Sequence, residues 1–221
     1  MKTIALIRRR PSLTRDQFRE YYETKHVPLA IRHVEFMKYA RSYLATSDEP
    51  GFDVLSEFWL ADPAAAAALA SSPSGAILRE DADRFVAGNG FRATVEERLV
   101  AGAPRGVQMG PARRYALMLT RPPDISHAAF ITFVNNWALR LFSGNSLRRV
   151  TLDIVRPYDD SIFPADAIVS LWPNENFDDA GLGTAPAVIA LAGILPLDVY
   201  ETPRATLTTA HPQFDELKGR R

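Results

Sequence analysis

The sequence predicts an α+β protein made of two copies of one β-α-β-β-α-β arrangement. Two observations support this prediction. Stretches with the alternating pattern of strands and stretches with helical spacing follow one another in that order between Lys2 and Val100. A weaker version of the pattern then recurs at the offset of 112 positions that separates Arg9 from Arg121.

The first strand and the start of the first helix are marked by local sequence. An apolar strand ends at Ile7, and Pro11 prevents it from continuing. Thr14 has the position of a helix N-cap, because its hydroxyl can accept a hydrogen bond from a free amide two or three residues later. Asp16 and Glu20 favour the early part of this helix, where the dipole stabilises negative charge.

One side of this helix gathers aromatic and polar side chains. The residues that share this side by helical spacing are Phe18, Tyr21, Tyr22, Lys25 and His26. Pro28 disfavours helical geometry at the residue before it, so the helix is expected to fray there. His26 is therefore expected at a helix end, one turn beyond Tyr22.

The other elements of the first half follow in order. Strands are predicted over residues 36–44, 53–60 and 91–100 from their aromatic-rich or alternating patterns. Pro63 starts an alanine-rich helix at the position that proline favours, and residues 74–85 predict a second helical piece. This order of elements is that of the ferredoxin-like fold.

The second half repeats the first in degenerate form, after a linker rich in Gly and Pro. The matched positions are Ser126 with Thr14, Phe130 with Phe18, Trp172 with Trp59, and a strand over 193–201 with the strand after Gly90. At the offset of 112 positions that separates Thr14 from Ser126, His26 becomes Ala138 and Tyr22 becomes Val134. We therefore expect the first half to carry any chemistry and the second to supply a partner surface.

Composition excludes several classes of protein. The 221 residues include 26 basic and 26 acidic side chains. The chain therefore lacks the excess of basic residues that is typical of proteins that bind nucleic acid. The absence of cysteine excludes disulfides and thiolate sites, and no histidines have zinc-like spacing. No apolar run approaches the length of a membrane span. We expect a cytoplasmic protein that binds neither membranes nor nucleic acid and holds no metal.

The stretch from Leu13 to Pro28 resembles the signature of the EthD family, within the dimeric α/β-barrel superfamily. The matching pattern is Leu13-Thr14-x-x-x-Phe18-x-x-Tyr21-Tyr22-x-x-x-His26-x-Pro28, and the likeness extends over residues 2–99. It implies two ferredoxin-like modules that pack sheet to sheet, here as an intramolecular α/β barrel. The expected division is 1–100 with the site, 101–113 as linker, 114–203 as second module and 204–221 as tail. The sequence does not decide whether the fused chain also forms a homodimer.

His26 and Tyr22 are the candidate catalytic residues. An imidazole titrates near neutrality, and the tyrosine hydroxyl could donate to a substrate oxygen. The alternative for His26 is a helix-end cap, and for Tyr22 a ring packed under the helix. The resemblance favours the catalytic interpretation of His26.

Five further residues are candidates for substrate binding: Glu57, Arg41, Arg8, Tyr43 and Trp59. Glu57 is a carboxylate between apolar neighbours on a strand, so it must be paired, hydrated or functional. The structural alternative for Glu57 is a salt bridge to Arg8 or Arg41 across the sheet. The two arginines could meet an anionic ligand, whereas Tyr43 and Trp59 are equally compatible with core packing.

The resemblance implies an enzyme that uses no cofactor. Its barrel relatives include dehydratases, decarboxylases and cyclases that act on polyketide-like or other hydrophobic carbonyl compounds. Such a site is expected in an apolar cleft between the helix and the sheet of the first module, ending at His26. There His26 would move a proton next to a carbonyl and Tyr22 would hydrogen-bond the developing oxyanion. The alternatives are a protein that only binds a hydrophobic ligand, and a haem-binding barrel with His26 as proximal ligand. Residues 157–164 could form a loop that covers the ligand.

Overall fold

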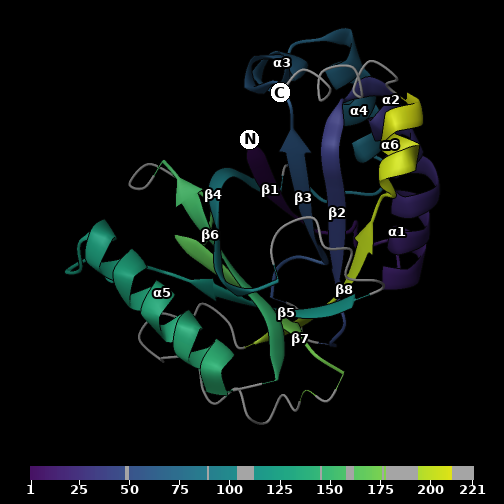
Figure 1. Ribbon diagram of the computed structural model, residues 1–221. Helices are drawn as coiled ribbons and strands as arrows, with labels where there is room; N and C mark the ends of the chain where they lie inside the picture. The colour runs from purple at the N-terminus through teal and green to yellow at the C-terminus, as the bar shows by residue number, and fades with distance from the viewer. Residues whose placement is uncertain are drawn as a thin grey trace. The chain divides into compact units, whose positions relative to one another are not determined.

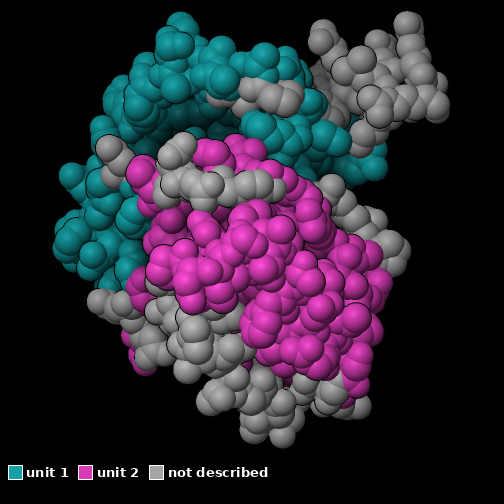
Figure 2. Space-filling view, turned by 90° about the vertical axis from the view of Figure 1, so that its left-hand side faces the viewer, with its two compact units in different colours: residues 1–43, 51–92, 200–221 teal, residues 44–50, 93–199 magenta. Residues whose placement is uncertain are grey.

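A computed structural model describes residues 1–47, 50–88, 90–103, 112–144, 146–157, 162–175, 177 and 194–210. The chain forms two compact units, coloured teal and magenta in Figure 2. Unit 1 contains residues 1–43, 51–92 and 200–221, and unit 2 contains residues 44–50 and 93–199. Helices and antiparallel strands make up both units, which confirms the predicted α+β class.

Unit 1 is built on three antiparallel strands in the order β1 (Lys2–Ile7), β3 (Val54–Leu60) and β2 (Phe36–Leu44). Ile4 pairs with Glu57 across β1 and β3, and Arg41 pairs with Ser56 across β2 and β3. Because side chains alternate along a strand, Glu57 and Ser56 lie on opposite faces of this sheet. β1 ends at Ile7 and β2 has the bounds that were predicted, whereas β3 begins one residue later than predicted.

The helices of unit 1 are α1 (Arg15–Tyr21), α2 (Val27–His33), α3 (Pro63–Leu69), α4 (Pro73–Ala82) and α6 (Arg204–Ala210), drawn in Figure 1. Thr14 caps α1 as predicted, because its hydroxyl accepts from the Gln17 amide while the Gln17 side chain accepts from the Thr14 amide. Asp62 caps α3 in front of Pro63. The polar tail expected from residue 204 begins with α6, whose Leu207 is buried.

The first helical segment does not end at Pro28, contrary to the prediction. It passes through a π-helical turn, η1 (Tyr22–His26), in which the Val27 amide donates to the Tyr22 carbonyl. Pro28 then lies in the first turn of α2, where its fixed φ fits the helical backbone. The wider turn accommodates the proline ring, which would otherwise meet a carbonyl of the preceding turn. His26 therefore lies inside a continuous helical segment.

The helices of unit 1 cover the sheet with an aromatic core. Phe18, Tyr22 and Phe85 are each 1% exposed and pack on one another with ring centroids 5.3 to 5.8 Å apart. Tyr39 and Tyr43 of β2 belong to the same cluster. The space between helix and sheet, where an apolar cleft was expected, is occupied at these positions by packed rings.

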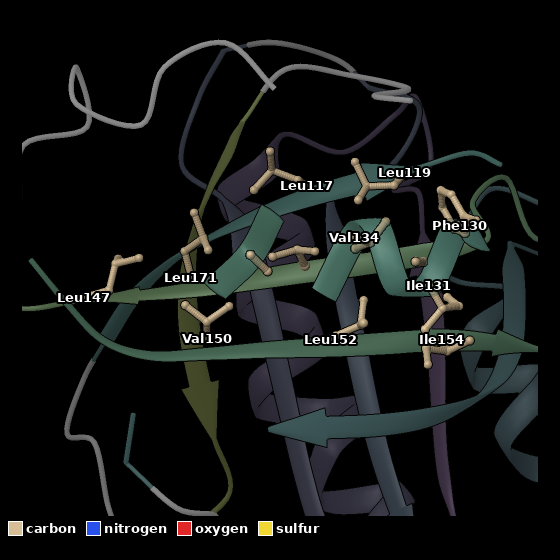
Figure 3. Close-up of a cluster of buried hydrophobic side chains, with 13 residues drawn as sticks. Leu117, Leu119, Phe130, Ile131, Val134, Leu147, Val150, Leu152, Ile154 and Leu171 are labelled. Atoms are coloured by element: carbon tan, nitrogen blue, oxygen red, sulfur yellow. The ribbon is translucent and has the colours of Figure 1, made fainter. Parts of the chain in front are cut away.

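Unit 2 pairs its strands in the order β8 (Leu195–Glu201), β5 (Ala112–Leu119), β7 (Ala167–Pro173), β6 (Leu147–Arg156) and β4 (Phe91–Gly102). Residues 200–201 of β8 and 91–92 of β4 are counted with unit 1. Helix α5 (His127–Gly144) packs Phe130 and Val134 against buried aliphatic residues of these strands, as Figure 3 shows. Ala138 belongs to the same cluster. The predicted linker overlaps the end of β4 and the start of β5, and residues 104–111 lie outside the described part. Residues 158–161 of the proposed covering loop do so as well.

Both units contain the same local contacts at the positions that match in sequence. The Arg9 amide donates to Asp53 at 2.8 Å, and its guanidinium donates to the Leu13 carbonyl. In unit 2 the Arg121 amide donates to Asp166 at 2.7 Å, and its guanidinium donates to the Ile125 carbonyl. Ser126 accepts from the Ala129 amide as Thr14 does from Gln17. No helix in the described ranges is long and apolar enough to cross a membrane.

Candidate active site

His26 is held by a carboxylate that comes from another helix. Its Nδ1 lies 2.8 Å from Oδ2 of Asp81, which α4 places against η1. Because a carboxylate has no proton to give, Nδ1 donates this bond and the unprotonated ring nitrogen is Nε2. This is the tautomer that a general base requires.

Tyr21 completes the contacts of Asp81. Its hydroxyl donates to Oδ1 at 2.8 Å, so the two carboxylate oxygens take one hydrogen bond each from Tyr21 and His26. Burial, followed by the hydrogen bond and the negative charge of Asp81, raises the pKa of Tyr21. The tyrosine therefore stays a proton donor and fixes the carboxylate that fixes the imidazole.

The imidazole is mostly enclosed by aromatic rings. Its centroid lies 5.1 Å from that of Tyr22 and 5.0 Å from that of Phe85, and 15% of the side chain is exposed. Burial lowers the pKa of His26, against the opposing effect of Asp81, and the positive charge of Arg92 lowers it further. The ring is consequently neutral at pH 7 and can accept a proton.

Tyr22 is buried in the core of unit 1 and is not exposed at the surface. Its hydroxyl is 2.9 Å from Ser56 Oγ and accepts a hydrogen bond from the Tyr39 hydroxyl at 3.1 Å. Burial is the main cause of the raised pKa of Tyr22, and Tyr39 likewise has its pKa raised by burial. The Tyr22 ring touches the His26 ring, whereas its hydroxyl is held on the sheet side.

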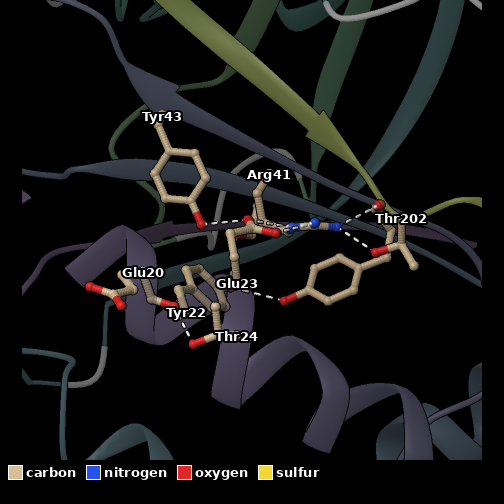
Figure 4. Close-up of polar contacts among 9 residues, drawn as sticks. Glu20, Tyr22, Glu23, Thr24, Arg41, Tyr43 and Thr202 are labelled. Atoms are coloured by element: carbon tan, nitrogen blue, oxygen red, sulfur yellow. Dashed lines mark hydrogen bonds and ion pairs between the residues drawn. The ribbon is translucent and has the colours of Figure 1, made fainter. Parts of the chain in front are cut away.

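Arg41 and Tyr43 are brought together by Glu23, as Figure 4 shows. Arg41 donates from Nε and Nη2 to the two oxygens of Glu23, and Tyr43 donates to Oε1 at 2.7 Å. The remaining Arg41 nitrogen, Nη1, donates to the Tyr39 carbonyl and to Thr202 Oγ1 at 2.6 Å. Burial and Glu23 raise the pKa of Tyr43. Two candidate substrate-binding residues therefore make contacts within the protein.

Glu57 and Trp59 lie on the face of the sheet opposite to Ser56, which bonds the Tyr22 hydroxyl. Glu57 forms a buried ion pair with Lys2 at 2.7 Å, rather than with Arg8 or Arg41. Lys2 lies on the same face of β1 as Ile4, the register partner of Glu57, whereas Arg41 opposes Ser56 on the other face. The Lys2 ammonium also lies 4.7 Å from the Trp59 ring centre. Arg8 is exposed at the end of β1.

Asp81, Tyr21 and Glu23 are the site residues that sequence reasoning missed. Asp81 is 55 positions from His26, and its sequence neighbourhood is that of an ordinary charged helix. The pairing depends on how α4 packs on η1, which no local pattern encodes. Successive residues of a helix point about 100° apart, so Tyr21 points away from Tyr22. Its hydroxyl nevertheless reaches the carboxylate behind His26.

Comparison with known proteins agrees with the resemblance seen in the sequence. Residues 10–89 match the family model of the EthD domain. No curated protein matches the chain in sequence.

Several solved structures share the fold. An anthrone oxidase-like protein superposes with a TM-score of 0.58 at 10% identity, covering 90% of this chain and 92% of that one. A proposed monooxygenase from Fusobacterium nucleatum subsp. nucleatum gives 0.52 at 12% identity, covering 90% and 91%. A proposed chlorite dismutase gives 0.52 at 9% identity, covering 94% and 96%. At these identities the likeness shows the fold alone.

Proposed function

Residues 10–89 of this chain form an EthD domain, and from this premise we propose that the protein is an enzyme for a small carbonyl or aromatic compound, with His26 as its acid-base group. The reaction class is proton transfer next to a carbonyl, as in a dehydratase, decarboxylase, cyclase or isomerase, without a cofactor. The observation that carries the proposal is the 2.8 Å bond between His26 Nδ1 and Asp81.

The bond supports the proposal because it sets both the direction and the protonation of the imidazole. With Nδ1 held, Nε2 is the nitrogen that takes and returns a proton. The enclosing rings of Tyr22 and Phe85 keep the imidazole neutral, and the exposed 15% of its side chain gives a substrate a way to reach it. A partly buried base of this kind is a typical candidate for catalysis.

Tyr22 serves this site as a packing partner of the imidazole. Its ring supports one face of His26, and the hydrogen bonds of its hydroxyl with Ser56 and Tyr39 fix that ring in place. We assign the substrate-facing role to His26, and a supporting role to Tyr22. Arg41 and Tyr43 act through Glu23, which they anchor within the turn that carries His26.

Anthrone is the first compound to test, because one protein of the same fold is anthrone oxidase-like and anthrone has an acidic C–H activated by a carbonyl. In deuterated buffer without oxygen, the enzyme should catalyse deuterium exchange at the anthrone methylene, followed by mass spectrometry. His26→Gln should lower the rate about 10²- to 10⁴-fold. Lys25→Gln, an exposed neighbour on η1, is the matched control and should exchange at the normal rate.

Equal exchange by wild type and His26→Gln would refute the proposal. Binding of the compound without exchange by the wild type would instead favour the ligand-binding alternative. An intense visible absorption band near 400 nm in the purified protein would favour haem, with His26 Nε2 as the nitrogen left to bind it.

We also infer that the two halves are tandem ferredoxin-like modules that pack as an intramolecular barrel, and that the second no longer takes part in chemistry. The repeated contacts of Arg9 with Asp53 and of Arg121 with Asp166 support a duplication. Asn135 of α5 matches Glu23 at the offset of 112 positions, so Asn135→Ala should leave anthrone exchange unchanged. A loss of exchange comparable with that of His26→Gln would oppose this assignment.

A further inference from the structure

We propose that Arg92 binds an anionic oxygen of the substrate beside His26, so that the compounds processed by this site are those that form an enolate or phenolate. This inference rests on the proposed function, because it names the substrate class of the same site. It is carried by the path of the chain from α4 to β4 and by the surroundings of the guanidinium.

The chain segment that follows Asp81 leads from a contact with His26 to Arg92. Phe85 packs on the imidazole, and its carbonyl accepts from the Arg10 amide at 2.8 Å. The next residues are tied to the end of β1, because Val86 bridges Arg9 and the Ala87 amide donates to the Arg8 carbonyl. Because three consecutive residues of this segment are held at the end of β1 by hydrogen bonds and a β-bridge, the position at which β4 can begin is restricted.

Gly90 fixes the point where β4 begins. Its φ is +60°, and a Cβ there would lie 2.7 Å from the Leu6 carbonyl oxygen, so only glycine lets the chain pass this close to β1. Arg92 is two residues further along, at the start of β4 and still within unit 1.

The guanidinium of Arg92 lies over an aromatic ring that belongs to the site's core. Its Cζ is 5.7 Å from the centre of Phe58, whose ring is 5.0 Å from that of Tyr39. Tyr39 in turn donates to Tyr22, which packs on His26. Arg92 is therefore positioned at the edge of the same aromatic cluster that encloses the imidazole.

Arg92 is available to a ligand. The residue is exposed, and among the residues that the structure describes no carboxylate lies within ion-pair distance of it. By contrast, Arg9 and Arg41 are engaged by Asp53 and Glu23. An arginine fork stacked on a ring and without a carboxylate partner is suited to a planar oxyanion.

The positive charge of Arg92 acts on the protonation of His26. Together with burial it lowers the pKa of the imidazole. The same cation would lower the energy of a negative charge that forms on a substrate held between them.

The chemistry balances without any other reactant. His26 Nε2 takes the proton of a C–H bond that a carbonyl activates, and the electrons of that bond move through the conjugated system to the carbonyl oxygen as an enolate. Arg92 donates hydrogen bonds to this oxygen, and the imidazolium formed is stabilised by Asp81. Return of the proton, or of deuterium from the solvent, to carbon completes the cycle with no net oxidation.

Benzoate is a suitable probe, because it joins an aromatic ring to a planar carboxylate. The four histidines allow the His26 ring resonance to be assigned by its loss in His26→Gln. Benzoate should shift this resonance in the wild type, and Arg92→Gln should weaken binding about tenfold, the loss expected for a charge-assisted hydrogen bond. Benzyl alcohol, the neutral analogue, should bind both proteins alike.

Arg32→Gln is the matched control, since Arg32 is an exposed arginine of α2. It should leave benzoate binding and the His26 pKa unchanged, whereas Arg92→Gln should raise that pKa. In the anthrone assay, Arg92→Gln should slow exchange, and Arg92→Lys should recover part of the rate.

Normal benzoate affinity together with an unchanged His26 pKa in Arg92→Gln would overturn the inference. If exchange then still required His26, the proposed function would stand without it. If no variant affected exchange, the proposed function itself would fail while the benzoate result still decided the role of Arg92.

Discussion

Arg41 of β2 and Glu23 of η1 form a two-point ion pair, with 3.0 Å from Nε to Oε1 and 2.6 Å from Nη2 to Oε2. The arginine side chain is 4% exposed and that of the glutamate 22%. The pair ties the turn that carries His26 to the sheet. Since π-helical turns are uncommon in proteins and concentrate at functional sites, this tie is a condition for the geometry of the site.

Removal of Glu23 should destabilise the protein substantially. In Glu23→Ala the buried guanidinium of Arg41 would lose its only carboxylate among the described residues, and the Tyr43 hydroxyl would lose its acceptor. We expect a loss of about 3 kcal/mol in the free energy of unfolding, measured with urea. Glu20→Ala, an exposed glutamate of the same helix, should cost less than about 0.5 kcal/mol. Similar values for the two variants would contradict this role.

Replacement of Asp81 should reduce proton exchange without unfolding the protein. The amide group introduced by Asp81→Asn can donate to His26 Nδ1, which then leaves the proton on Nε2, the wrong tautomer for a base. We expect the anthrone exchange rate to fall about 10²-fold or more. Asp83→Asn, an exposed aspartate at the end of α4, should react normally. A normal rate for Asp81→Asn would show that the carboxylate does not position the imidazole.

The lowered pKa of His26 predicts a pH-dependent stability. Between the pKa in the folded protein and about 6.5, the ordinary value in an unfolded chain, the unfolded state binds more protons than the folded one. Stability from this group is therefore complete above pH 6.5 and is lost as the pH falls through that window. Urea unfolding from pH 5 to 7.5 should show a shallower decline for His26→Gln than for wild type. Equal slopes would mean that the imidazole has no lowered pKa.

Local sequence predicted the elements of unit 1 well because their signals are short-range. The Thr14 cap, the start of α3 behind Asp62 and the bounds of β2 each depend on residues a few positions apart. The π turn was not predicted, because the residue before a proline disfavours helical geometry and the helix was therefore expected to end before Pro28. The pattern does not reveal that a wider turn can absorb the ring.

The site itself was only half predictable. His26 was found from its family-like spacing, whereas Asp81 approaches it from a helix 55 positions away. Glu57 was expected to need a partner, and the burial argument was correct, but the choice of Lys2 follows from strand register that the sequence does not state. Burial cost predicts that a partner exists, and tertiary packing decides which residue it is.

Substitution of Gly90 tests whether the close approach of the chain to β1 determines the position of Arg92. Gly88 and Gly90 both have left-handed φ values, +67° and +60°, but only at Gly90 would a Cβ meet backbone, 2.7 Å from the Leu6 oxygen. Gly88→Ala should therefore cost about 1 kcal/mol from its backbone conformation alone. Gly90→Ala should cost at least about 1 kcal/mol more, because the start of β4 must move away from β1.

That movement should also reach the ligand site. If the start of β4 positions Arg92, Gly90→Ala should weaken benzoate binding as well as stability, whereas Gly88→Ala should bind benzoate like the wild type. Urea unfolding and the His26 resonance shift measure the two effects on the same samples. A Gly90→Ala protein that is destabilised but binds benzoate normally would show that Arg92 does not depend on this close approach.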